Sequence, residues 1–226
     1  MVRFNERALY VAIEGLDGSG KTTLYDNLSQ RLTEAGIAWA PCLPTRRDEE
    51  PHTLERVADS LPCLGQFWPY RSLVYARRSR RMACRTDWSK PLILGDRSLV
   101  TSYAVYWHRF PHPRLAVRWV DLLEPTLPAP DCVLYLDLDQ EELTRRKLQR
   151  GNPLDRDEVG YRPLQMGEAF QDLRRQRIPV PRLEGTRWHL LDARETRDAL
   201  CQAAWRHVQK LLTEKGPVTD GFRDAS

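Results

Sequence analysis

The chain has 226 residues, of which 41% are hydrophobic and 29% are charged, with a formal net charge of +4. These values exclude a disordered chain and are typical of one globular domain with a buried core. The small positive charge does not demand a nucleic-acid partner. The many arginines instead suit anionic ligands, because a guanidinium binds phosphate through a two-pronged fork.

The cysteines and the N-terminus bear on where the protein resides. Residues 1–7 carry charges of both signs and lead into an apolar run that is too short for a signal peptide or a membrane span. We therefore expect a cytoplasmic protein that has neither a membrane nor a nucleic acid as a partner. No CxxC pair occurs, which predicts reduced thiols rather than a zinc site at the five cysteines, Cys42, Cys63, Cys84, Cys132 and Cys201.

The predicted elements alternate between strands and helices. Leu9 to Glu14 is an apolar run that predicts a strand, and Thr22 to Ala35 predicts a helix because leucines recur at helical spacing until Gly36. Helical stretches separate four further strands, which are expected at residues 37–42, 91–95, 132–137 and 187–191. Buried strands with helices between them imply an α/β fold of three layers, in which a five-stranded parallel sheet binds ligands at the carboxyl ends of its strands.

A glycine-rich segment follows the first predicted strand. Gly15 to Thr22 reads GLDGSGKT, which matches the phosphate-loop pattern GxxxxGKT between a strand and a helix. Glycines let successive backbone N–H groups point at phosphates, and the helix N-terminus adds partial positive charge. We expect Lys21 to bridge the β and γ phosphates of ATP and Thr22 to offer its hydroxyl to Mg²⁺. Further contacts to ATP are expected from Gly18, Ser19, Gly20 and Thr23.

A charged pair, Asp96 and Arg97, follows the third predicted strand. In a parallel sheet of this kind the pair lies beside the phosphate loop, where Asp96 is expected to bind the water shell of the metal and Arg97 an anion. A salt bridge between the two side chains is the alternative interpretation. A phosphate loop alone does not separate a kinase from a GTPase, a motor or a regulatory ATPase, so the acceptor must be inferred from other residues.

Six short segments occur together in one order along the chain. They are IEGLDGSGKTTL at 13–24, TR at 45–46, YARR at 75–78, DRS at 96–98, PDCVLYLDLD at 130–139 and RGNPLDRDE at 150–158. The set resembles the thymidylate kinase family of nucleoside monophosphate kinases, and no guanine-specificity NKxD motif is present. The resemblance implies a P-loop NTPase-type fold, transfer from Mg·ATP to a nucleoside monophosphate with dTMP expected, and a homodimer. It also implies one domain at 1–215, with a short lid at 148–160 and a flexible tail at 216–226.

The resemblance assigns roles on the acceptor side. It implies that Arg46, Arg78 and Arg97 surround the acceptor phosphate and that Asp17 meets the hydroxyl of the sugar. Transfer between two phosphates brings two polyanions together, so guanidiniums and Mg²⁺ must supply the neutralising charge. No side-chain base is expected, because the acceptor phosphate is already an anion at neutral pH.

The segment from Arg150 to Arg156 resembles the lid of the family. The phosphate loop carries Gly18 and Ser19 where some members of the family have an arginine. The guanidinium that steadies the transferring phosphoryl group should therefore come from the lid. Arg156 is expected in that catalytic role, and Arg150 is expected near the adenine or the phosphates.

The positions that would bind the base depart from the family. Val74 stands where an aromatic residue usually stacks on thymine, Ser98 replaces a tyrosine, and the glutamine or aromatic residue expected near Val105 and Tyr106 is missing. The acceptor could therefore be a modified nucleotide or one with a different base, and Val74 is expected to line the acceptor pocket. The stacking face is expected from one of the aromatic residues Trp68, Tyr70, Tyr75 and Tyr103.

Two other functions stay open. A nucleoside kinase, whose acceptor is a hydroxyl, would need a carboxylate base near the second strand, for which Glu49 and Glu50 are the candidates. A non-catalytic, regulatory ATP-binding protein would keep the loop without turnover. The HRFPHP segment at 108–113 only faintly suggests a metal site, and its prolines favour a surface loop.

Overall fold

A computed structural model describes residues 8–47, 52–61, 63, 67–149 and 161–215. Five parallel strands form one sheet in the order β2-β3-β1-β4-β5. The strands are β1 Leu9–Gly15, β2 Trp39–Cys42, β3 Leu92–Asp96, β4 Cys132–Asp137 and β5 Arg187–Asp192. The predicted five-stranded parallel sheet is confirmed, with small differences at the ends of the strands.

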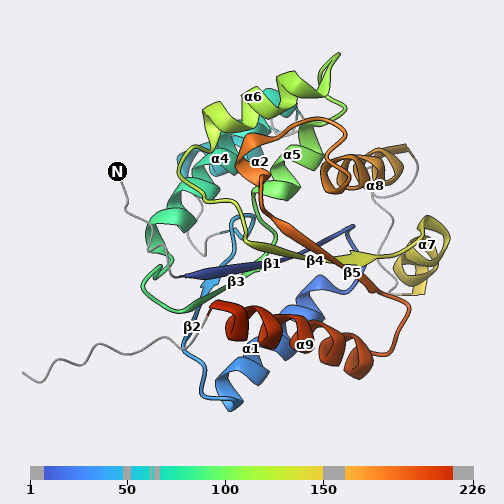
Figure 1. Ribbon diagram of the computed structural model, residues 1–226. Helices are drawn as coiled ribbons and strands as arrows, with labels where there is room; N and C mark the ends of the chain where they lie inside the picture. The colour runs from blue at the N-terminus through green and yellow to red at the C-terminus, as the bar shows by residue number, and fades with distance from the viewer. Residues whose placement is uncertain (1–7, 48–51, 62, 64–66, 150–160, 216–226) are drawn as a thin grey trace, which may run out of the picture.

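Helices cover both faces of the sheet, as Figure 1 shows. On one face lie α1 and α9, and on the other lie α2, α4, α5, α6 and α8. The helices are α1 Lys21–Glu34, α2 Thr53–Ser60, α4 Trp68–Arg85, α5 Leu99–Tyr106, α6 Pro113–Leu123, α7 Gln140–Gln149, α8 Tyr161–Arg174 and α9 Arg197–Lys215, with a short 3-10 helix at Pro181–Leu183. This arrangement is the three-layer α/β fold that the sequence predicts.

The centre of the sheet is the core of the protein. Every residue of β1 is buried, because strands lie on both of its edges and helices on both of its faces. From α1 the leucines Leu24, Leu28 and Leu32 pack onto the sheet, each at most 2% exposed. Their spacing places them on one side of the helix, as the sequence predicts. A strand buried in this way gives the phosphate loop at its end a rigid base.

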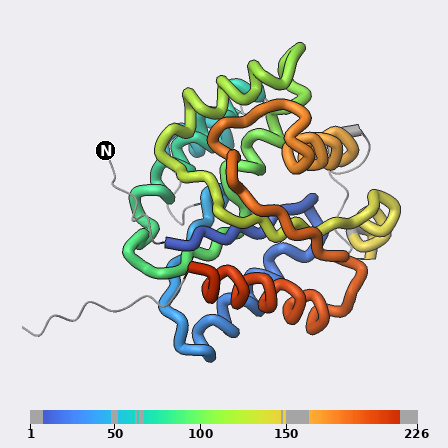
Figure 2. The backbone as a smooth tube through the Cα atoms, viewed as in Figure 1, coloured from blue at the N-terminus to red at the C-terminus, as the bar shows by residue number. Residues whose placement is uncertain are grey.

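The carboxyl ends of β1 and β4 point to the same edge of the sheet, which Figure 2 lets the reader follow along the backbone. Beside this edge lie α7 and α8. The expected lid at 148–160 begins in the last turn of α7 and otherwise lies outside the described residues, as does the expected tail at 216–226.

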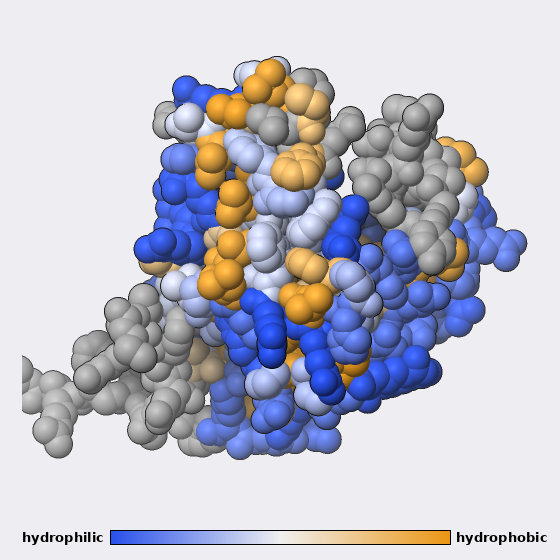
Figure 3. Space-filling view, turned by 90° about the horizontal axis from the view of Figure 1, so that it is seen from above, coloured by the Kyte–Doolittle hydropathy of each residue, from blue (hydrophilic) through white to orange (hydrophobic). Residues whose placement is uncertain are grey.

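The surface on the α6 side, seen in Figure 3, is mostly hydrophilic with hydrophobic residues gathered in an interrupted band. Two leucines of α6 are among the exposed hydrophobic residues of the chain, Leu115 at 42% and Leu122 at 73%. Among the described residues, none of the helices is long and apolar enough to cross a membrane.

Candidate active site

The phosphate loop joins β1 to α1. Gly15, Gly18 and Gly20 have φ angles of 145°, 97° and 102°, which residues with a side chain rarely adopt. A Cβ atom on Gly15 would lie 2.9 Å from the carbonyl oxygen of Leu136 and 2.9 Å from Oγ of Ser19. The path of the loop therefore favours glycine at all three positions, of which the GxxxxGKT pattern predicts Gly15 and Gly20.

Lys21 extends back over this loop. Its side chain is nearly buried, and Nζ donates a hydrogen bond to the Leu16 carbonyl at 2.8 Å and lies 3.5 Å from the Asp17 carboxylate. Burial, and then the charge of Arg97, lowers the pKa of Lys21 to about 8. Beside it, Oγ of Ser19 is buried and has no hydrogen-bond partner within the described part of the chain. The loop thus holds a cation and a free polar group where the phosphates of ATP are expected.

Asp96 ends β3 beside the phosphate loop, directly opposite Ile13 of β1. Its Oδ1 is buried and accepts no hydrogen bond from any described residue. Burial raises the pKa of Asp96, while Lys21 and Arg97 act in the opposite direction. Nearby, Thr22 at the start of α1 is exposed. A carboxylate oxygen without a partner and an accessible hydroxyl are hard oxygen ligands, so these two residues fit Mg²⁺ and its water shell.

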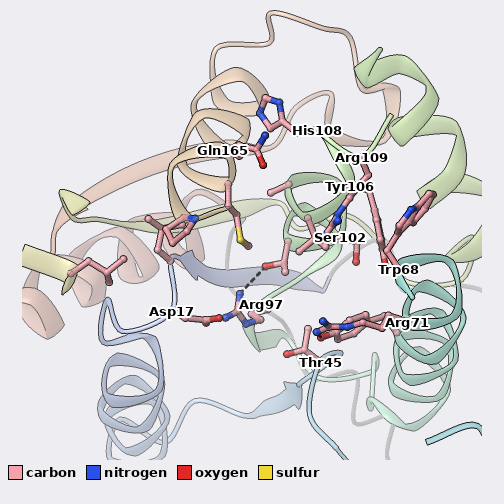
Figure 4. A pocket seen from close by; sticks show the side chains of 18 residues that line it. Asp17, Thr45, Trp68, Arg71, Arg97, Ser102, Tyr106, His108, Arg109 and Gln165 are labelled. Atoms are coloured by element: carbon pink, nitrogen blue, oxygen red, sulfur yellow. Dashed lines mark hydrogen bonds and ion pairs between the residues drawn. The ribbon is translucent and has the colours of Figure 1, made fainter. Parts of the chain in front are cut away.

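Arg97 lies in the turn between β3 and α5. Its φ of 70° is uncommon for a residue with a side chain, and its N–H donates to the Ile13 carbonyl at 3.0 Å. The guanidinium pairs with Asp17 and donates to Oγ1 of Thr101 at 3.4 Å, as Figure 4 shows. Two residues predicted on the acceptor side, Asp17 and Arg97, are therefore in direct contact.

Glu14 is a residue that the sequence analysis did not single out. It is completely buried in β1, and its carboxylate accepts hydrogen bonds from Ser98 at 2.7 Å and Thr101 at 2.5 Å. Burial raises the pKa of Glu14, which the two hydroxyl groups and the charges of Arg97 and Lys21 partly offset. The carboxylate therefore connects the carboxyl end of β1 to the start of α5. A glutamate inside an otherwise apolar strand was the signal that could have identified it.

A cavity of about 460 Å³ opens beside the loop, which is the size of a small-molecule site. Asp17 and Arg97 lie at one end of it, and aromatic and basic side chains of α4 and α5 lie toward the other end (Figure 4). The far end is lined by the aromatic residues Trp68, Tyr75 and Tyr106 and by the basic residues Arg71 and Arg109. We call these two regions of the cavity its phosphate end and its far end.

Four residues predicted on the acceptor side do not line this cavity, namely Arg46, Val74, Arg78 and Tyr103. Arg78 donates to Glu55 at 2.6 Å and to the Thr45 carbonyl at 3.3 Å, within a buried ion pair. Val74 is buried at 9% exposure, and Tyr103 is completely buried, with its hydroxyl donating to Asp121 at 2.5 Å. The predicted contacts of Val74 and Tyr103 with the acceptor are corrected accordingly, because neither residue lines the cavity and the hydroxyl of Tyr103 is bound to Asp121.

Of the other stacking candidates, the structure brings Trp68 and Tyr75 to the cavity. The hydroxyl of Tyr70 instead donates to the Leu54 carbonyl at 2.8 Å, and Tyr70 does not line the cavity. Arg46 is exposed and directly follows Thr45, which does line it. Arg150 and Arg156 lie outside the described residues.

The carboxylates expected of a nucleoside kinase can also be placed. Glu49 and Glu50 lie outside the described residues. Glu55, a buried carboxylate that follows β2 and that the sequence analysis missed, is held by Arg78 and does not line the cavity. Because Glu55 does not face the cavity, the structure does not support it as the catalytic base that a nucleoside kinase would need.

The histidines of the 108–113 segment have separate surroundings. His108 lines the cavity with Nε2 3.9 Å from Glu168, while Nδ1 of His112 accepts from the Arg114 N–H at 3.1 Å at the start of α6. Across the described ranges, no three His, Cys, Asp or Glu side chains gather where they could hold a metal ion.

Phosphoryl transfer between two bound molecules needs a loop that surrounds the donor phosphates, a metal-binding carboxylate beside it and a separate cavity for the acceptor. The fold and the site provide such a loop, the unpartnered carboxylate of Asp96 beside it and a cavity of suitable size, and they define a P-loop phosphotransferase. The family model described as thymidylate kinase matches residues 13–203. The chain belongs to the thymidylate kinase family, and it is an ATP-dependent nucleoside monophosphate kinase.

Individual relatives agree with this assignment. The chain is 29% identical to a probable thymidylate kinase of Pyrococcus abyssi, over 74% of this chain and 87% of the relative. It is 32% identical to a thymidylate kinase of Pelotomaculum thermopropionicum, over 65% and 70% of the two chains. A probable thymidylate kinase of Thermoplasma acidophilum is 28% identical, over 72% and 84%.

Proposed function

We propose that this kinase transfers the γ-phosphoryl group of Mg·ATP to a deoxynucleoside 5′-monophosphate, with dTMP as the acceptor and dTDP as the product. The observation that carries the proposal is the position of Arg97. Its guanidinium contacts Asp17 of the phosphate loop and Thr101 of α5, so it lies between the expected donor phosphates and the acceptor cavity. The names of the three relatives support dTMP in particular.

Binding and neutralisation carry the proposed mechanism. The N–H groups of the loop and Lys21 bind the β and γ phosphates, and contacts to these phosphates replace the contact of Nζ with the Leu16 carbonyl. Arg97 binds the phosphate of the acceptor, and Asp17 orients the hydroxyl of its sugar. Mg²⁺, when bound through Thr22 and through water held by Asp96, supplies positive charge between the phosphates. No side chain needs to remove a proton.

The proposal also covers three further arginines, the location of the protein and its oligomeric state. Arg156 steadies the transferring phosphoryl group, Arg150 contacts the nucleotide, and Arg46 approaches the acceptor phosphate. The protein acts in the cytoplasm as a homodimer. The exposed leucines of α6, Leu115 and Leu122, support an association through the helices on that face of the sheet. Size-exclusion chromatography with light scattering measures the oligomeric state.

A screen of acceptors tests the reaction. Purified protein is incubated with Mg·ATP and each of dTMP, dUMP, dCMP, dAMP and dGMP, their ribonucleotide counterparts and thymidine, and ADP formation is followed with product identification. We expect dTMP to give dTDP with the highest kcat/KM. Turnover of thymidine without turnover of any monophosphate would favour a nucleoside kinase. ATP binding without turnover of any acceptor would favour a regulatory protein.

A further inference from the structure

The hydroxyl of Tyr106 is a polar group without a visible purpose in the fold. Tyr106 is the last residue of α5, it is 3% exposed, and it lines the far end of the cavity. Its hydroxyl is buried and forms no hydrogen bond with any residue that the structure describes. Leaving such a group unsatisfied costs about 1–3 kcal/mol, so a natural protein is expected to satisfy it with water or a ligand.

The ring of Tyr106 is held in a fixed position. The ring centroid of Trp68 lies 6.3 Å from that of Tyr106. Trp68 is itself held edge-on by Phe110 at 5.2 Å and by Trp119 at 5.9 Å. Because these large rings restrict one another, the ring of Tyr106 keeps its place without a hydrogen bond from its hydroxyl.

The charged groups near Tyr106 that line the cavity with it are hydrogen-bond donors, while the nearby carboxylate of Glu124 does not line the cavity. These donors are Arg109, which Figure 4 shows beside Tyr106, and Arg71, which it shows beside Thr45. Arg71 stands over the ring of Tyr75 and donates to its hydroxyl at 3.4 Å. A guanidinium can only donate hydrogen bonds, while a tyrosine hydroxyl can donate one and can also accept. The far end of the cavity therefore suits a ligand edge that presents acceptors.

Figure 4 shows Arg97 beside Asp17, whereas Tyr106 lies apart from them beside Arg109 and nearer to Trp68. An acceptor whose phosphate binds Arg97 extends its base toward Tyr106. The inference that follows depends on the proposed function, because it identifies which base the same cavity selects.

We propose that Tyr106 is a specificity-determining residue, whose buried hydroxyl donates a hydrogen bond to a carbonyl oxygen of the acceptor base. Thymine and uracil present such an oxygen at C4, where cytosine has an amino group. Cytosine would place its amino group, a donor, against guanidiniums that cannot accept a hydrogen bond. A site built around a hydrogen bond discriminates strongly against a ligand that cannot form it.

Tyr106→Phe removes only the hydroxyl and leaves the ring in its aromatic surroundings. For the unliganded variant we expect a Tm equal to or higher than that of the wild type, because an unsatisfied buried group is removed. The kcat/KM for dTMP should fall about ten-fold and that for dCMP should stay the same, with KM for ATP unchanged. The rise in Tm that saturating dTMP produces should shrink.

Tyr103→Phe is the matched control on the same helix. Its hydroxyl is satisfied inside the protein by Asp121, so this variant should lose stability and keep the ratio of dTMP to dCMP activity. A Tyr106→Phe variant that behaves like this control would overturn the inference. It would mean that the hydroxyl is satisfied within the protein, for instance through water shared with Glu124, whose buried Oε2 also has no partner among the described residues.

The wild-type enzyme is measured first, which separates the two hypotheses. Turnover of no nucleoside monophosphate would overturn the proposed function and this inference with it. A wild type that prefers dCMP would overturn dTMP as the proposed acceptor and the inference with it. An active wild type that prefers dTMP over dCMP, and whose preference survives Tyr106→Phe, would overturn the inference alone.

Discussion

The two ends of the cavity are built in different ways. The phosphate end is made by one continuous loop and by residues at the ends of adjacent strands, with Lys21, Asp96 and Arg97 close together. The far end is made by side chains of separate helices, α4 and α5, that meet only in the folded protein. Charged groups, among them the unpartnered Oδ1 of Asp96, characterise the first region, and aromatic rings that hold one another characterise the second.

This difference separates chemistry from selection. Neutralising two phosphates requires the same groups for every acceptor, and the loop and strand ends supply them locally. Choosing a base requires a shape and a pattern of donors, which depend on how helices pack. A substitution at the phosphate end should therefore affect all acceptors alike, whereas a substitution at the far end should affect some acceptors and not others.

Lys21→Ala gives the largest expected effect. Removing the ammonium group should lower kcat about 1,000-fold for dTMP and dCMP alike, because the lost interaction is with the donor phosphates. Steady-state kinetics with both acceptors measures this, and circular dichroism checks that the fold remains. Lys90→Ala, at an exposed lysine near Asp87, is the control and should leave kcat unchanged. A change in the ratio between the acceptors would break the separation of the two ends.

Arg156→Ala should lower kcat about 100-fold and change the affinity for ATP much less, because its contact is proposed to strengthen in the transition state. Kinetics at saturating substrates, together with ATP titration by calorimetry, distinguishes the two quantities. The control is Arg145→Ala, which removes an exposed arginine of α7 that pairs with Glu142. Weaker ATP binding with a normal kcat would contradict the role proposed for the lid.

Arg78→Ala tests a residue that the structure places at neither end. Glu55 would keep a buried charge without its partner, which is expected to cost about 3 kcal/mol of unfolding free energy. The double variant Arg78→Ala/Glu55→Gln should recover much of that loss, as denaturant unfolding would show. A higher KM for dTMP in the double variant would instead indicate that Arg78 contacts the acceptor.

Asp96→Asn should change the stability less than Arg78→Ala does, and it should stabilise the protein rather than destabilise it. Burial raises the pKa of Asp96 above its ordinary value of 3.8, so the charged carboxylate is disfavoured in the folded protein. The favourable contribution of the protonated form is present below pH 3.8 and is lost as the pH rises through the folded-state pKa. At pH 7 the variant should therefore melt at a higher temperature and turn over more slowly, and the melting difference should disappear near pH 3. A lower Tm at pH 7 would contradict this expectation.

The sequence was sufficient to predict the sheet and the phosphate loop because both are local. Apolar runs mark the buried strands, and the glycines of the loop lie within eight consecutive residues, Gly15 to Thr22. The ends of adjacent parallel strands must meet, so Asp96 could be placed beside that loop.

The far end could not be predicted in the same way. Successive residues of a helix point about 100° apart, so Tyr75 reaches the cavity while its neighbour Val74 packs inside. Arg78 is one of many arginines of α4, and no local pattern shows that Glu55 binds it. The hydroxyl of Tyr106 has meaning only when its burial and its lack of a partner are known.

The buried carboxylate of Glu14 fixes the two halves of the site, the phosphate loop and the start of α5, relative to each other. Because it anchors the first turn of α5 to the central strand, the base of the phosphate loop and the guanidinium of Arg97 are aligned when the chain folds, before either nucleotide arrives. The relative position of the donor and acceptor phosphates is then set by the folded scaffold itself.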